Sequence, residues 1–184
     1  MPDVRVQRTR DALREALIDL SETQAFEAIT VRAIAAKAGV GYATFFRHYP
    51  DKEALLAAVA EGLTLTLLQV MKPLFMRCDS LAAARSLCAF VDAHRPIHVA
   101  LLAGGSGEAI RSWLLPQIIE TVNATRQAPP RSTAAEIVLN HSVSATLNLM
   151  AAWLRHPPMT AETAATLIND LVLVPSLAVQ GRAG

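Results

Sequence analysis

The sequence predicts an all-α chain in which a small helix-turn-helix unit precedes a larger helical bundle. Apolar residues recur at helical spacing along most of the 184 residues, and no stretch makes a convincing strand. Turn signals such as Gly39 and Pro157-Pro158 fall between the apolar stretches. Four aromatic residues also crowd into positions 42–49, although Phe, Trp and Tyr make up only 5% of the chain. A short, rigid aromatic helix just after a glycine turn is typical of a helix-turn-helix.

The first two helices follow from apolar spacing and capping. Residues 4–20 carry apolar side chains on one side and charged ones opposite, namely Val6, Ala12, Leu13, Ala16, Leu17 and Leu20. Thr30 is a suitable N-cap for a second helix, and Gly39 is a suitable end for it. Gly39 also allows the positive φ that a tight turn needs.

The third helix covers the aromatic stretch and is expected to be two-sided. At 100° per residue its four aromatic side chains fall in one arc, with Phe45 and Tyr49 toward the core and Tyr42 and Phe46 at the rim. The opposite arc is small or polar, and it consists of Ala43, Thr44, Arg47 and His48. Since so short a helix cannot hold itself together, the aromatic side must anchor it. Its N-terminus and polar face are then free to enter a DNA major groove.

After residue 50 the sequence pattern predicts further helices and no strand. Asp51 can cap a long fourth helix that runs to about Met71. Thr133 and Glu136 have capping-box spacing, and Pro175 is expected to kink the last helix. The later helices are expected at 80–94, 96–103, 108–126, 133–156 and 160–179.

Composition narrows the class of protein. The formal net charge of +1 does not mark a nucleic-acid binder, so that case depends on local placement. Cys78 and Cys88 form neither a disulfide framework nor a zinc pattern, which favours a reducing compartment. No run reaches about 18 uninterrupted apolar residues, so we expect a cytoplasmic protein with no membrane span. The hydrophobic content of 52% nevertheless suggests apolar surface buried in a partner subunit or around a ligand.

An enzyme is not expected, and neither is a metal or cofactor. The run Gly104 to Glu108 resembles a nucleophile elbow, but Glu108 occupies the position of the last glycine and no strand flanks it. The same run lacks the lysine of a phosphate-binding loop. His94 and His98 bracket Pro96 without a Cys or acidic set that would complete a metal site. A helical interaction module without DNA binding is an alternative, but it leaves the glycine turn and aromatic helix unexplained.

The stretch "TVRAIAAKAGVGYATFFRHYPDKEALL" resembles the N-terminal signature of the TetR (tetracycline-repressor) family of transcriptional regulators. The resemblance covers about residues 8–56. It implies a DNA-binding domain at 1–52 and a helical ligand-binding and dimerisation domain at 53–184. The family is dimeric, so 133–156 and 160–179 would pair with their copies. The implied function is a ligand-responsive regulator of operator DNA, a repressor that a small, largely apolar molecule releases from its operator. The alternative is a helical interaction module or a transcriptional activator with no small-molecule effector.

The resemblance also implies roles for single residues. Thr30 would cap its helix near a phosphate, and Arg32 would reach a base edge or a phosphate. Tyr42, Ala43 and Thr44 would meet bases or phosphates at the start of the recognition helix. Phosphate contacts would come from His48 and Lys52. The full set of expected DNA-binding residues is Thr30, Arg32, Gly41, Tyr42, Ala43, Thr44, Phe46, Arg47, His48 and Lys52. Phe46 departs from the family, in which tyrosine is usual, and so lacks a hydroxyl for a phosphate.

A small apolar or aromatic effector is expected, because the predicted helices offer Leu, Met, Phe and Trp and almost no charge to a pocket. Asn140, Ser144 and Asn148 recur every four residues. Such a polar stripe suits a pocket wall or a two-fold axis, and a solvent-facing seam equally well. The expected ligand-binding residues are Met71, Phe75, Phe90, His98, Trp113, Asn140, Ser144 and Asn148.

Overall fold

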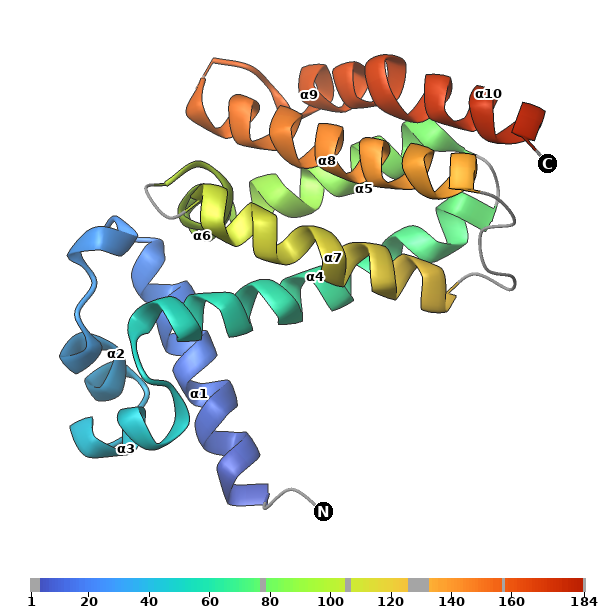
Figure 1. Ribbon diagram of the computed structural model, residues 1–184. Coiled ribbons are helices and arrows are strands. Elements are labelled where there is room, and N and C mark those ends of the chain that lie inside the picture. The colour runs from blue at the N-terminus through green and yellow to red at the C-terminus, as the bar shows by residue number, and fades with distance from the viewer. Residues whose placement is uncertain (1–3, 77–78, 105–106, 126–132, 157, 184) are drawn as a thin grey trace. The chain divides into compact units, whose positions relative to one another are not determined.

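The computed structural model describes residues 4–76, 79–104, 107–125, 133–156 and 158–183 (Figure 1). Within those ranges every regular element is helical, as the sequence predicts. The chain divides into two compact units, Met1–Gly62 and Leu63–Gly184. The division falls inside a long helix rather than at its start near residue 52. Each unit has its own core.

The N-terminal unit contains four helices and one short 3₁₀ turn. They are α1 (Val4–Ser21), η1 (Phe26–Ala28), α2 (Val31–Lys37), α3 (Tyr42–His48) and the first part of α4 (Lys52–Met76). One fully buried cluster draws on all four helices and consists of Leu13, Leu17, Ile34, Phe45, Leu55 and Leu56. This cluster fixes α3 against the other helices.

The turn between α2 and α3 forms as the capping signals predict. The Thr30 hydroxyl accepts a hydrogen bond from the Ala33 N–H at 3.1 Å, which caps the start of α2. Gly39 has φ 67°, and the Val40 N–H returns to the Ala35 carbonyl at 3.0 Å. A side chain at position 39 would strain this left-handed conformation. The turn therefore sets the start of α3 through backbone geometry.

The C-terminal unit is a bundle built on α8 (Thr133–Arg155). Helix α8 packs against α7 (Gly107–Thr125) and α9 (Ala161–Ile168), and α9 packs against α5 (Ser80–Ala93). The short α6 (Arg95–His98) leads into the π-helical η2 (Val99–Ala103). Trp153, Ile97 and Ile168 are among the most buried side chains.

Cys88 lies in this second core, as a small apolar filler would. Burial, followed by the charges of Asp92 and Glu162, raises the pKa of its thiol to about 12. A thiol that stays protonated is a poor nucleophile and a poor metal ligand. Cys78 lies outside the described residues.

The last predicted helix is interrupted where the sequence predicts a kink. Between α9 and α10 (Val174–Ala183) the chain forms a π-helical turn, η3 (Asn169–Leu173). Pro175 has no N–H to give to the carbonyl of Leu171, and its ring crowds that carbonyl. The Val174 N–H instead bonds to the Asn169 carbonyl, five residues back. The wider π-helical turn makes room for the proline, and the chain stays helical from α9 through α10.

Much apolar helix surface is left uncovered by the chain itself. Three spans, 52–70, 133–155 and 161–179, are long and apolar enough on average to cross a membrane, judged by length and composition only. Within the chain, 33% or less of each span is buried. Exposed apolar side chains on the last two spans include Ile137, Leu171, Val174 and Leu177.

Candidate nucleic-acid interface

The aromatic side of α3 divides into a buried and an exposed half. Phe45 and Tyr49 lie in the core, as expected, whereas Tyr42 is 52% and Phe46 45% exposed. The Phe45 and Phe46 rings meet edge to face with centroids 5.3 Å apart, and Phe46 and Tyr42 do so at 5.2 Å. We call Tyr49, Phe45, Phe46 and Tyr42 the aromatic ladder. It runs from the core of the N-terminal unit to its surface.

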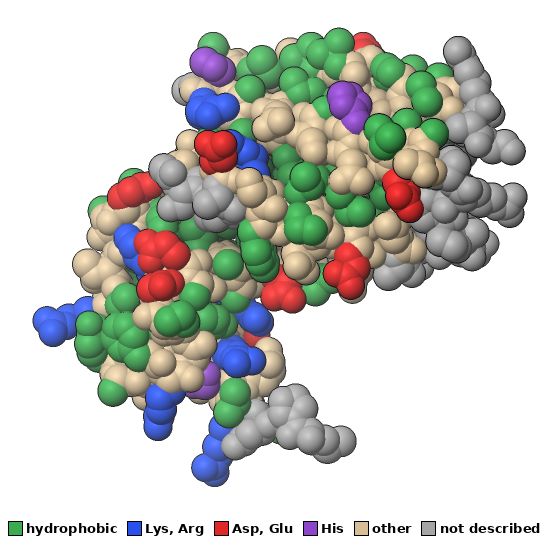
Figure 2. All heavy atoms as spheres, viewed as in Figure 1, with side chains coloured by type: hydrophobic (Ala, Val, Ile, Leu, Met, Phe, Trp, Pro, Cys, Tyr) green, Lys and Arg blue, Asp and Glu red, His purple; other side chains and the backbone are tan. Residues whose placement is uncertain are grey.

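The opposite side of α3 is polar and basic. Arg47 Nη2 donates a hydrogen bond to the Thr44 hydroxyl at 2.9 Å, so the two side chains hold each other across one helical turn. His48 is half-buried, and its pKa is lowered by desolvation and then by the charges of Arg10 and Arg47. Figure 2 shows Lys and Arg side chains projecting from this unit. The positive charges of this face are therefore those of Arg47 and of Arg10 close to His48.

Two helix N-termini carry the remaining expected residues. Gly41 caps α3 in an extended conformation and supplies no side-chain acceptor. The Thr44 N–H bonds to the Gly41 carbonyl at 2.8 Å, so only the N–H groups at the very start of α3 keep their capacity for a ligand. Ala43 is exposed beside it. Arg32, exposed in the first turn of α2, lies over the Tyr42 ring with its guanidinium carbon 5.8 Å from the centroid. Residues from α2 and α3 are thus brought together at one surface.

Lys52 has a different place from the one the sequence suggested. Its ammonium donates to the carbonyls of Phe26, Glu27 and Ile29 at 3.0, 3.1 and 3.1 Å, and it lies 4.6 Å from the centroid of the Phe26 ring. An ammonium has three N–H donors, and all three are used. Lys52 therefore ties the start of α4 to the η1 segment, which leaves no ammonium N–H for a phosphate. The contact joins residues far apart in the chain, so no local sequence pattern indicates it.

The expected ligand-binding residues whose side chains the structure describes are spread over α5, α6, α7 and α8. Trp113 and Asn148 are exposed, and Ser144 is half-buried. Phe90 stacks edge to face on buried His98 at 5.8 Å, and His98 Nδ1 lies 2.8 Å from the His94 carbonyl oxygen. The side chains of Met71 and Phe75 lie outside the described residues. The alternating exposure of the α8 stripe fits a solvent-facing seam or a subunit contact better than a closed pocket.

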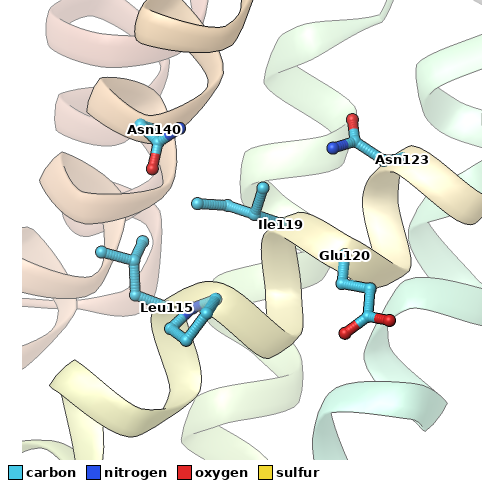
Figure 3. A pocket seen from close by; sticks show the side chains of 6 residues that line it. Leu115, Ile119, Glu120, Asn123 and Asn140 are labelled. Atoms are coloured by element: carbon cyan, nitrogen blue, oxygen red, sulfur yellow. The ribbon is translucent and has the colours of Figure 1, made fainter. Parts of the chain in front are cut away.

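A groove of about 450 Å³ lies between α7 and α8 (Figure 3). Leu115 and Ile119 extend from α7 toward α8, which carries Asn140, and Glu120 points away from them. The groove is lined by Leu115, Pro116, Ile119, Glu120, Asn123 and Asn140. Asn123 Oδ1 is buried without a hydrogen-bond partner among the described residues. Of the expected residues with described side chains, Asn140 alone borders this groove, and α7 supplies lining residues that the sequence did not indicate.

The N-terminal unit is similar to a known family of proteins. Residues 13–59 match the model of the bacterial regulatory proteins of the tetR family. Over 60 residues the chain is 43% identical to the uncharacterized HTH-type transcriptional regulator YxbF of Bacillus subtilis (strain 168). That match covers 32% of this chain and 16% of YxbF, so it concerns one domain.

Two solved structures resemble the chain over nearly its full length. A tetR-family transcriptional regulator from Streptomyces coelicolor aligns with TM-score 0.61 and 18% identity, covering 97% of this chain and 84% of that one. RolR in complex with the ligand resorcinol aligns with TM-score 0.53 and 18% identity, covering 97% and 95%. At such identities the likeness shows a common fold in both units.

Proposed function

We propose that the chain is a regulator of the TetR family, because residues 13–59 match the model of that family, and that it acts as a ligand-responsive repressor of transcription. One observation carries the proposal. Phe45 and Tyr49 anchor the short α3 in the core, while the N-termini of α2 and α3 and a basic face remain exposed. A helix held in this way fits a major groove. Such a protein works where the DNA is, in the cytoplasm.

The proposed DNA contacts follow the exposed groups. Arg32, Ala43 and Thr44 would face base edges or phosphates at the start of α3, and Tyr42 would lie at the DNA with its ring rather than its hydroxyl as the contributing group. Arg47 and His48 would meet the phosphate backbone, which supplies most of the affinity. Gly41 and Thr30 would let the N-termini of α3 and α2 approach phosphates closely. Phe46 would contact DNA only through its ring.

We also propose a homodimer formed by α8 and the segment 161–183. Leu171, Val174 and Leu177 follow one another at three-residue spacing and are all exposed. A second copy would cover them in a four-helix arrangement that buries well over about 1,000 Å². Two recognition helices related by a two-fold axis would read a near-palindromic operator.

The effector proposed is a small, largely apolar or aromatic molecule that carries hydrogen-bond donors. The α7–α8 groove supports it, because Leu115 and Ile119 offer an apolar wall and the Asn123 oxygen has no donor within the described residues. The likeness to RolR, which was solved with resorcinol, supplies a class of probe. Phe90, His98, Ser144 and Asn148 stay predictions as further ligand contacts.

Selection of duplexes from a random library tests DNA binding. We expect purified protein to enrich a near-palindromic site whose affinity falls steeply with salt concentration. Arg47→Ala should weaken binding to all duplexes, and Thr44→Ala should relax sequence preference. Arg155→Ala, an equally exposed arginine at the end of α8, is the control and should change neither. No enrichment by folded protein would refute the proposal.

A thermal-shift screen with simple phenols and anilines, and with sugars as the contrasting class, tests the effector. Ile119→Ala should weaken stabilisation by an apolar hit, whereas Leu65→Ala, an exposed residue of α4 outside the groove, should not. Stabilisation by sugars alone would contradict the proposed class.

A further inference from the structure

The aromatic ladder ends on a guanidinium. From the buried Tyr49 and Phe45 it passes through Phe46 to Tyr42, and Arg32 of α2 lies over the Tyr42 ring. Each successive pair of rings on α3 is in contact, with centroid distances of 6.1, 5.3 and 5.2 Å. The ladder thus connects a rigid core to one charged side chain on a different helix.

Arg32 has no hydrogen bond or ion pair in the described part of the chain, so the Tyr42 ring is its one recorded partner there. A free arginine samples many rotamers, and binding DNA would require it to give up that freedom. A ring face restrains a guanidinium and still leaves its N–H donors in the plane available. The contact therefore preorganises Arg32 without using the groups that would meet an acceptor.

We propose that Tyr42 is a positioning residue for Arg32, whose guanidinium meets an acceptor on the DNA beside the start of α3. The assignment rests on the proposed DNA-binding function. The acceptor is either a phosphate oxygen or the O6 and N7 edge of a guanine, both of which suit the planar donors. The ring of Tyr42, and not its hydroxyl, performs this role.

Phe46 supports the same assignment. It stands where the family usually has tyrosine, and its ring makes edge-to-face contacts with the rings of Phe45 and Tyr42. A phenylalanine is sufficient for a rung of the ladder, whereas a phosphate-binding role would need the hydroxyl that it lacks. The departure from the family pattern is then without consequence for this surface.

A double-mutant cycle on the duplex that wild-type protein selects tests the proposal. Tyr42→Phe should bind like wild type, and Tyr42→Leu should bind about 2- to 5-fold more weakly, as expected for an exposed cation–π contact. In an Arg32→Ala background, Tyr42→Leu should add little. Duplexes changed at one base pair at a time distinguish the acceptor: loss of preference at a single G·C pair indicates the guanine edge, and a uniform loss indicates phosphate. Additive effects, or equal losses in Tyr42→Phe and Tyr42→Leu, would overturn the positioning role.

A measurement on free protein separates this inference from the function on which it rests. The ring current of Tyr42 should shift the Arg32 side-chain proton resonances in wild type and in Tyr42→Phe, and Tyr42→Leu should remove that shift. Without the shift in folded wild-type protein, the positioning role is wrong even if DNA binds. If the shift is present but no duplex is enriched, the proposed DNA-binding function is wrong. The proposed contact of Arg32 with DNA is then wrong as well.

Discussion

Lys52 shows how one side chain can hold the N-terminal unit together. Its ammonium is the shared partner of the Phe26, Glu27 and Ile29 carbonyls, which would otherwise face one another unpaired. Hydrogen bonds to a charged group stabilise more than neutral ones do. The family resemblance implied that Lys52 contacts a DNA phosphate, whereas its contacts in the structure stabilise the fold.

Lys52→Met is therefore expected to lower the free energy of unfolding by about 2–3 kcal/mol, because three carbonyls lose their donor. Lys37→Met is the matched control. Lys37 pairs with Asp19 at 3.0 Å, but both side chains are about half exposed, and such a pair contributes only about 0–1 kcal/mol. Denaturant titration of both variants measures the difference. Equally small losses of unfolding free energy in both variants would favour a phosphate contact for Lys52 instead.

Tyr49 offers a stabilising change. Its hydroxyl is buried and has no hydrogen-bond partner within the described residues. Tyr49→Phe removes the unsatisfied group and keeps the ring contact with Phe45. We expect unfolding to require up to about 1 kcal/mol more, seen as a higher melting temperature. Tyr42→Phe, a change at a half-exposed ring, should leave the melting temperature unchanged. A lower melting temperature in Tyr49→Phe would mean that water satisfies the Tyr49 hydroxyl.

His48 gives DNA affinity a dependence on pH. Desolvation and the charges of Arg10 and Arg47 lower its pKa in the free protein, and a nearby phosphate would raise it. Binding would then take up a proton, so affinity should rise as the pH falls through about 6.5, the ordinary histidine range. Titrating the duplex at a series of pH values measures the slope, and His48→Gln should flatten it. An unchanged slope in that variant would place His48 away from phosphate.

Among the helices, α6 carries a comparable group in the second core. Burial lowers the pKa of His98, so the unfolded chain binds its proton before the folded one does. The stabilising contribution is present above about pH 6.5 and is lost as the pH falls from there toward the lower folded-state pKa. His98→Gln should weaken this fall in melting temperature, and the exposed His141→Gln should not. His48, whose pKa is also lowered, accounts for part of the remaining dependence.

Local signals predicted the helices well, because caps, glycine turns and helical periodicity act over a few residues. Thr30, Gly39 and Pro175 each shape the chain where the sequence indicated. The π-helical form of 169–173 was not predicted, since only the backbone shows how the chain accommodates Pro175. The Lys52 contacts and the α7–α8 groove were missed for a different reason. Both join residues far apart in sequence, and a periodicity on one helix cannot say which neighbour it meets.

For the chain as a whole, the proposed dimer gives the clearest test of the apolar composition. Leu171, 61% exposed, lies in the proposed contact, whereas Leu65, 47% exposed, lies on α4. Leu171→Glu should yield a folded monomer that binds a single half-site weakly, because a buried carboxylate in the contact would lack a partner. Leu65→Glu should remain dimeric. Sedimentation equilibrium measures both, and a dimeric Leu171→Glu protein would place the contact elsewhere.

The presence of two cores in one chain has a calorimetric consequence. Each unit buries its own apolar cluster, so heat is expected to unfold the protein in two steps rather than one. A molecule that binds one unit raises chiefly the transition of that unit, in proportion to the logarithm of its concentration. In a calorimetric scan, operator duplex would then raise the unfolding temperature of the N-terminal unit, and effector would raise that of the C-terminal unit. A compound that moved both peaks together would report energetic coupling between the units without any need to observe their motion.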